Sequence, residues 1–121
     1  MARPGPILIV DDNAETTAAL TAMLDLRGYE TASALDGLDA LSQLRAGLRP
    51  SLIVLDWMMP NLDGRGFLER VAADSQLRSI PVVIYSALGS RIRADDVVAT
   101  VSKGTDPDLL LDVVARYAKA A

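Results

Sequence analysis

The 121-residue chain contains no cysteine and no histidine. Without cysteine it has no disulfide framework, no thiol nucleophile and no cysteine metal site. Without histidine it lacks the commonest general base and the commonest ligand of transition metals. Any metal that its side chains bind must therefore be a hard cation held by oxygen atoms.

The chain also lacks a long apolar run and a basic cluster. Its apolar runs are too short to span a membrane, and the first six residues lead into only four apolar ones, too few for a signal peptide. The net charge of −4, without a basic cluster, argues against nucleic acid as a direct partner. We expect one domain covering residues 1–121, cytoplasmic and not inserted in a membrane.

The segment from Leu52 to Asp56 organises the chain. Its four branched apolar residues predict a strand buried on both faces, as in a parallel sheet covered by helices. The strand ends at Asp56, and open α/β sheets bind ligands at the carboxyl ends of their strands. Pro60 and the Asp63-Gly64 pair predict a turn before the next helix. Taken alone, Asp56 is as consistent with a capping role as with chemistry.

The other elements follow from similar patterns. The expected strands, besides the one at 52–55, are Ile7–Val10, Tyr29–Ala34, Ile80–Tyr85 and Val97–Val101. Helices are expected after Asn13, Asp36, Gly64 and Asp106-Pro107, with inward-facing residues Leu20, Met23, Leu24, Ala40, Leu41, Leu44, Phe67, Leu68, Val71, Leu110, Val113, Val114 and Tyr117. The alternation predicts an α/β fold with a doubly wound five-stranded parallel sheet, for which the flavodoxin-like order 2-1-3-4-5 is one common arrangement. The segment Leu88–Ala94 offers at most two turns, so the fourth helix is expected to be short.

Four of the five expected strands end in a residue that can do chemistry: Asp11 with Asp12, Asp56, Ser86 and Lys103. With the order 2-1-3-4-5 these side chains would meet at one edge of the sheet. Three carboxylates in one pocket repel each other unless a cation lies between them, and Mg²⁺ is the natural candidate among oxygen-bound metals. Lys103 and Ser86 could each donate to a phosphoryl oxygen. The set suits phosphoryl transfer with a carboxylate nucleophile.

Each signal is weak when it is taken alone. Asp12 or Asn13 could simply cap the first helix, Ser86 could cap the next helical turn, and a single lysine is usually a surface residue. The combination, in this order and at this spacing, is what favours a site.

Together these residues resemble the receiver domain of two-component response regulators, in its single-domain, CheY-like form, over nearly the whole chain. The matching positions are the acidic pair Asp11-Asp12, the phosphoacceptor Asp56, the turn Met59–Gly64, the switch pair Ser86-Ala87 and the lysine Lys103. The resemblance implies that Mg²⁺ is bound by Asp12, Asp56 and the carbonyl of Met58, with Asp11 acting through water. It also implies a sensor histidine kinase or histidine phosphotransfer protein as donor, and a downstream protein target or phosphorelay step as output.

The chain departs from the family pattern in three places. Gly104 follows the lysine where the family has proline, so a trans bond is expected there. Thr100 stands where the family has an aromatic switch residue. Only the 16 residues 87–102 separate Ser86 from Lys103, too few for a full fourth helix. The usual dimerisation surface should therefore be poor, and we expect a monomer.

Two apolar residues are expected to flank the path of a hydrolytic water, Met58 and Leu88, which predicts slow loss of the phosphoryl group. We do not expect an enzyme acting on other substrates, only self-catalysed phosphoryl transfer and autodephosphorylation. A pseudo-receiver that binds a partner without phosphorylation is one alternative. An aspartyl-phosphate phosphatase is a weaker one, because Asn13 occupies the position where such enzymes need a second aspartate.

Overall fold

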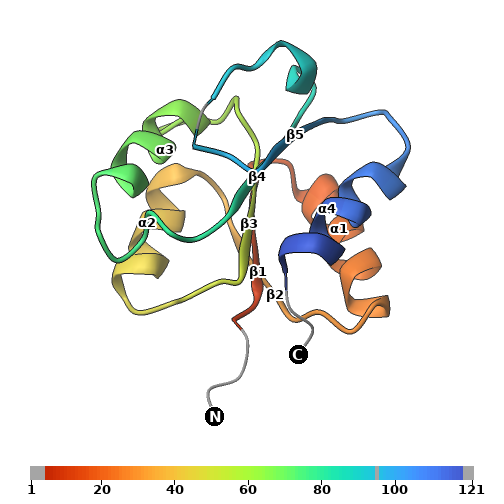
Figure 1. Ribbon diagram of the computed structural model, residues 1–121, viewed down its shortest axis with the longest axis horizontal. Coiled ribbons are helices and arrows are strands. Elements are labelled where there is room, and N and C mark those ends of the chain that lie inside the picture. The colour runs from red at the N-terminus through yellow and green to blue at the C-terminus, as the bar shows by residue number, and fades with distance from the viewer. Residues whose placement is uncertain (1–4, 95, 119–121) are drawn as a thin grey trace.

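The computed structural model describes residues 5–94 and 96–118. Its five parallel strands have the order β2-β1-β3-β4-β5 and are β1 (Ile7–Val10), β2 (Thr31–Ala34), β3 (Leu52–Leu55), β4 (Val82–Ser86) and β5 (Ala99–Ser102). The helices are α1 (Ala14–Leu26), α2 (Gly37–Arg45), α3 (Gly64–Ala72) and α4 (Pro107–Tyr117), with one 3₁₀ turn, η1 (Gly89–Arg91). Helices α2 and α3 cover one face of the sheet and α1 and α4 the other (Figure 1). The predicted fold class and strand order are confirmed.

The central strands β1 and β3 are buried on both faces, as their unbroken apolar sequences predict. Alternate side chains enter two separate apolar layers. Leu8 and Ile53 pack in the layer under α2 and α3, whereas Ile7 and Leu52 pack in the layer under α1 and α4. In the part of the chain that the structure describes, no helix is long and apolar enough to cross a bilayer.

Each of the four α-helices begins at a side chain that caps it. The carboxamide of Asn13 and the carboxylates of Asp36, Asp63 and Asp106 each accept a hydrogen bond from a backbone N–H in the first turn. Such caps contribute about 0.5–2 kcal/mol each to stability. The predicted start of the last helix at Asp106-Pro107 is confirmed, with Pro107 as the first helical residue.

Three strand boundaries were predicted wrongly. Strand β2 starts at Thr31 because Tyr29 still donates its N–H to Leu24, at the end of α1. Strand β4 runs from Val82 to Ser86 rather than 80–85, since Ser86 pairs with Ser102. Strand β5 covers 99–102 rather than 97–101, because its pairing with β4 begins only at Ala99.

One predicted core residue is also wrong. Tyr117 lies in the last turn of α4, where it is 36% exposed and outside the apolar layer, and Leu111 is buried instead. The remaining residues of the predicted inward stripes are buried or half-buried.

The connection between β4 and β5 has almost no helix. The predicted fourth helix is reduced to the single turn η1, which ends at an extended Ile92 and is followed by irregular backbone to residue 94. A Cβ atom on Gly89 would lie 2.6 Å from the carbonyl of Val101, so η1 packs directly on the backbone of β5. Thr100, in the middle of β5, is exposed.

Candidate functional site

The carboxyl ends of the central strands bring the acidic residues together. Val10 and Leu55 are partners in the register of β1 and β3, so Asp11 and Asp56 are the next residues on adjacent strands. The N–H of Asp56 donates to the carbonyl of Val10 (2.9 Å), and that of Asp11 to the carbonyl of Ala34 (3.1 Å). The hydrogen bonding between strands thus continues one residue beyond the sheet, and it fixes the backbone positions of Asp11 and Asp56.

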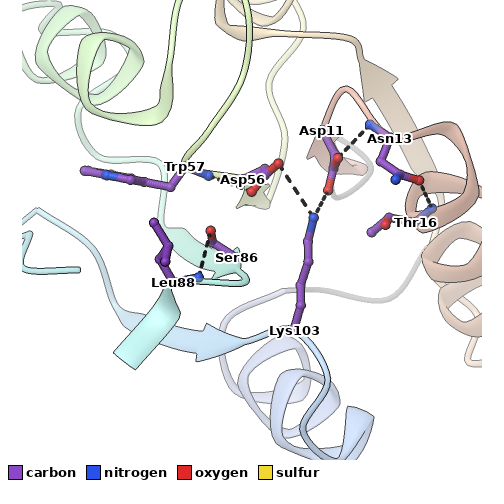
Figure 2. Close-up of polar contacts among 8 residues, drawn as sticks. All are labelled: Asp11, Asn13, Thr16, Asp56, Trp57, Ser86, Leu88 and Lys103. Carbon is purple, nitrogen blue, oxygen red and sulfur yellow. Dashed lines mark hydrogen bonds and ion pairs between the residues drawn. The ribbon is translucent and has the colours of Figure 1, made fainter. Parts of the chain in front are cut away.

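Lys103 reaches these carboxylates from the edge of the sheet. Its own N–H donates to the carbonyl of Ser86 (2.9 Å), which anchors the residue beside β4. Its Nζ lies 2.8 Å from Oδ2 of Asp11 and 3.6 Å from Oδ2 of Asp56 (Figure 2). Both acids are buried, and the lysine side chain is 23% exposed. The ammonium group can therefore meet an anion that approaches from solvent.

Each buried carboxylate uses its other oxygen to accept a backbone N–H. Oδ1 of Asp11 accepts from Asn13, and Oδ1 of Asp56 accepts from Trp57, both at 2.8 Å (Figure 2). These bonds hold the two carboxylates in one orientation. The oxygen Oδ2 of Asp56 remains directed toward the lysine.

Burial and charge act in opposite directions on these groups. Burial raises the pKa of Asp56, the charge of Asp11 raises it further, and Lys103 opposes both. For Lys103 burial favours a lower pKa, but the hydrogen bond and charge of Asp11, with the charge of Asp56, outweigh it, so the net shift is upward. The lysine is therefore held in its charged form at neutral pH.

The donor set fits a hard cation. One oxygen from each of Asp11, Asp12 and Asp56 lies within 4.8 Å of the other two. Asp12 is exposed, whereas the other two are buried, so the cluster opens to solvent on one side. Three carboxylates against one ammonium leave excess negative charge that a divalent ion would neutralise. All-oxygen ligation suits Mg²⁺ better than a transition metal.

The remaining predicted residues surround this cluster. Ser86 is buried at the end of β4, where its hydroxyl accepts a hydrogen bond from the N–H of Leu88 (3.3 Å) (Figure 2). Leu88 is therefore next to the site, although it is 36% exposed. Ala87 is exposed, and Met58 is 65% exposed. Among the described residues, Ser86 has no hydrogen bond to Asp56.

The lysine loop follows the sequence prediction at Gly104. The described residues contain no cis peptide bond, and Gly104 has φ +85°, a conformation that glycine adopts without strain. The loop thus turns back through glycine rather than through a cis bond.

Sequence reasoning missed one pair of contacts that holds the turn after the acceptor. Asn61, at φ +66°, donates its side-chain N–H to Oδ2 of Asp36 (2.7 Å), and Gly37 donates its N–H to the carbonyl of Leu62 (3.1 Å). We name these two bonds the α2 clamp. Asparagine adopts positive φ more readily than most residues. Its partner Asp36 lies 25 residues away, so no local pattern in the sequence predicts the bond.

The fold and the site define a class: a doubly wound α/β domain whose sheet edge joins an acidic cluster to one lysine. Residues 7–115 match the family model of the response regulator receiver domain. The chain therefore belongs to that family.

Curated relatives carry the same domain within longer proteins. The transcriptional regulatory protein PrrA of Mycobacterium bovis is 38% identical over 115 residues, covering 91% of this chain and 47% of PrrA. The transcriptional regulator RpaA of Synechocystis is 33% identical over 100 residues, covering 83% of this chain and 40% of RpaA. This chain thus spans about half the length of the curated relatives it matches, or less.

Solved structures share the fold throughout. The receiver domain of a histidine kinase from Syntrophus aciditrophicus is 28% identical with a TM-score of 0.81, covering 93% of this chain and 89% of that one. The chemotaxis protein CheY4 of Vibrio cholerae is 26% identical with a TM-score of 0.77, covering 95% of this chain and 99% of CheY4. TrrA of Thermotoga maritima, solved in complex with Mg²⁺ and BeF, has a similar fold, with a TM-score of 0.82 at 24% identity. The match covers 93% of this chain and 98% of TrrA.

Proposed function

We propose that this receiver domain is a phosphoacceptor in which Asp56 takes a phosphoryl group from a phosphohistidine. The observation that carries the proposal is the position of Asp56: a buried carboxylate beside the acidic pair, with Oδ2 3.6 Å from the ammonium of Lys103. The donor would be a sensor histidine kinase or a histidine phosphotransfer protein, and the reaction would take place in the cytoplasm.

The transfer forms one bond and breaks one. An Oδ atom of Asp56 attacks phosphorus, the bond from phosphorus to the imidazole nitrogen breaks, and its electron pair stays on that nitrogen. Lys103 then has the charge and reach to neutralise one phosphoryl oxygen, and Ser86 can donate its hydroxyl to another. Autodephosphorylation reverses the modification: water attacks phosphorus, the bond to Asp56 breaks, and inorganic phosphate leaves.

Mg²⁺ is part of the proposal. Asp12 and Asp56 would bind the ion directly with the carbonyl of Met58, and Asp11 through water. A bound Mg²⁺ supplies positive charge to the oxygens of the transferring group. The support in this chain is the cluster of three carboxylates, and a fold neighbour has been solved with Mg²⁺ and BeF.

The phosphorylated domain would signal by a change of shape or pass the phosphoryl group on to another protein. The curated relatives named above are transcriptional regulators about twice the length of this chain or more. Their action on transcription is a property of those proteins, and a downstream protein target is what we propose for this one.

Intact-mass measurement tests the proposal. The protein is incubated with acetyl phosphate and Mg²⁺, beside Asp56→Asn and the control Asp112→Asn, which changes an exposed acid on α4. Wild type and Asp112→Asn should each gain one phosphate mass, and Asp56→Asn should gain none. Modification of Asp56→Asn at the wild-type level would refute the assignment. No modification of the wild type would favour a receiver that binds its partner without phosphorylation.

A further inference from the structure

A groove runs along α3 on the side where the connection from β4 to β5 forms only η1. Two adjacent hollows make up this groove, and they share Leu68, Ala72 and Asp96. One continues past Val71 to Ile80 and Val82, and the other past Arg65 and Glu69 to Trp57. We name the two together the α3 groove.

The floor of the α3 groove is apolar. Leu68, Val71 and Val82 belong to the buried layer under α2 and α3, and the half-buried Ile80 packs against the same layer. Since these side chains are already covered, the apolar surface open to an occupant comes from the half-buried Trp57, Ala72, Ile80 and Ala94 above them.

The rim of the α3 groove is charged. Arg65, Arg78 and Arg93 are exposed on it, together with the carboxylates of Glu69 and Asp96. Among the described residues of the rim, three arginines stand against two acids, in a chain with a net charge of −4. Within the described residues, none of the three guanidinium groups forms an ion pair. They are therefore available to carboxylates of another molecule.

Trp57 connects the α3 groove to the acceptor. Its indole ring lies 5.3 Å from the guanidinium carbon of Arg65 and lines the groove. Its backbone N–H donates to Asp56 (2.8 Å), and the ring points away from that carboxylate (Figure 2). An occupant of the groove would thus contact the residue next to the acceptor without entering the carboxylate cluster.

We propose that the α3 groove is a docking site for an acidic segment of a partner protein, with apolar side chains on its floor and carboxylates on Arg65, Arg78 and Arg93. Charge complementarity selects this occupant, because three exposed arginines that form no ion pair with a described residue flank the groove, on a chain with a net charge of −4. Docking does not require phosphorylation of Asp56, so this inference stands apart from the proposed function.

Selection from a displayed library of random 12-residue peptides, without Mg²⁺, tests the proposal. Selected peptides should carry net negative charge around apolar residues, and their synthetic copies should change the fluorescence of Trp57, the single tryptophan. Each of Arg65→Glu, Arg78→Glu and Arg93→Glu should raise the Kd roughly tenfold or more, the effect of losing a hydrogen bond to a charged group. These arginines are exposed, so the variants should fold.

Two controls make the test specific. Arg116→Glu, on the exposed side of α4, and Asp56→Asn should both bind the peptides with wild-type affinity. Selection of no peptide, selection of neutral or basic peptides, or equal loss of binding in Arg116→Glu would overturn the proposal. Concentration-dependent dimers that Arg93→Glu dissociates would also overturn it, since the occupant would then be a second copy of this chain.

Discussion

The ammonium group of Lys103 lies 2.8 Å from Asp11 but 3.6 Å from Asp56. The lysine is therefore hydrogen-bonded to Asp11 and forms a longer ion pair with Asp56. The cluster holds three carboxylates, two of them buried, beside this one ammonium group. We expect this excess of negative charge to destabilise the metal-free fold.

Asp56→Asn should make the metal-free protein more stable at neutral pH. Burial and Asp11 raise the folded-state pKa of Asp56 above its ordinary value of 3.8, so the folded protein binds this proton more tightly than the unfolded chain does. Stability contributed at this site is thus full below pH 3.8 and is lost as the pH rises through the raised folded pKa. Thermal unfolding at pH 7 should show a melting temperature higher by a few degrees in Asp56→Asn. The difference should shrink toward pH 3.8. A less stable variant at pH 7 would contradict this view.

With Mg²⁺ bound, the wild type should be more stable than Asp56→Asn, because the ion neutralises the carboxylate cluster of the wild type. At a free concentration 100 times the Kd, binding to the folded state alone adds about 2.7 kcal/mol to the free energy of unfolding. Asp12→Asn should lose this gain, since it removes an exposed carboxylate of the cluster. Calorimetric titration with Mg²⁺ measures the Kd of the wild type and of Asp12→Asn, and Asp112→Asn serves as the matched control. Unchanged Mg²⁺ affinity in Asp12→Asn would exclude Asp12 as a ligand.

The phosphoryl group should be lost slowly. Leu88 lies against Ser86 through its backbone, and neither its side chain nor that of Met58 can orient a water molecule. Loss of one water-orienting hydrogen bond of about 1.4 kcal/mol slows hydrolysis roughly tenfold. Decay of the phosphoprotein in Mg²⁺ should therefore be faster in Met58→Asn or Leu88→Glu than in the wild type. Equal decay in all three would show that these side chains do not control the water.

The phosphorylated form should remain monomeric. The connection between β4 and β5 forms one 3₁₀ turn, and Thr100 on β5 is exposed, so the surface that a fourth helix would build is missing. Sedimentation of the protein with beryllofluoride and Mg²⁺ measures its oligomeric state. A two-fold dimer across β5 and α4 would refute the prediction.

The α2 clamp should stabilise the fold in a pH-dependent way. The hydrogen bond from Asn61 lowers the pKa of Asp36, as does the N–H of Asp39. A lowered folded pKa contributes stability that is present above the unfolded pKa and is lost as the pH falls through the folded pKa. Asn61→Gly keeps the positive φ and removes the bond, so its loss of stability should be greater at pH 7 than in acid, where only the entropic cost of glycine remains. A loss independent of pH would mean that the bond to Asp36 is not its cause.

Sequence periodicity was enough to predict the parallel sheet and most of the core, whereas its order came with the resemblance to receiver domains. The unbroken apolar runs of β1 and β3 predict burial on both faces, and the order 2-1-3-4-5 makes the residues that follow them neighbours. The limits of β2 and β5 could not be predicted, because an edge strand extends only as far as its single partner pairs with it.

Of the site, sequence could predict which residues converge but not how they bond. The Nζ atom of Lys103 lies 2.8 Å from Asp11 and 3.6 Å from Asp56, and sequence alone cannot predict which of the two contacts is shorter. The N–H of Trp57 and the α2 clamp leave no pattern in the sequence, since backbone donors are the same in every residue and the clamp joins positions 25 apart.

Strand β5 pairs on one side only, and its Thr100 is exposed. The lysine of the site follows directly after this strand. Local opening free energies within a protein range from near zero to the global value, and sparsely covered edges lie at the low end. We therefore expect β5 to detach in excursions that leave β1, β3 and the two acids in place. Asp56 would then remain in place without the ammonium group of Lys103 beside it. Heating should therefore abolish phosphoryl uptake at a lower temperature than the one at which the core unfolds.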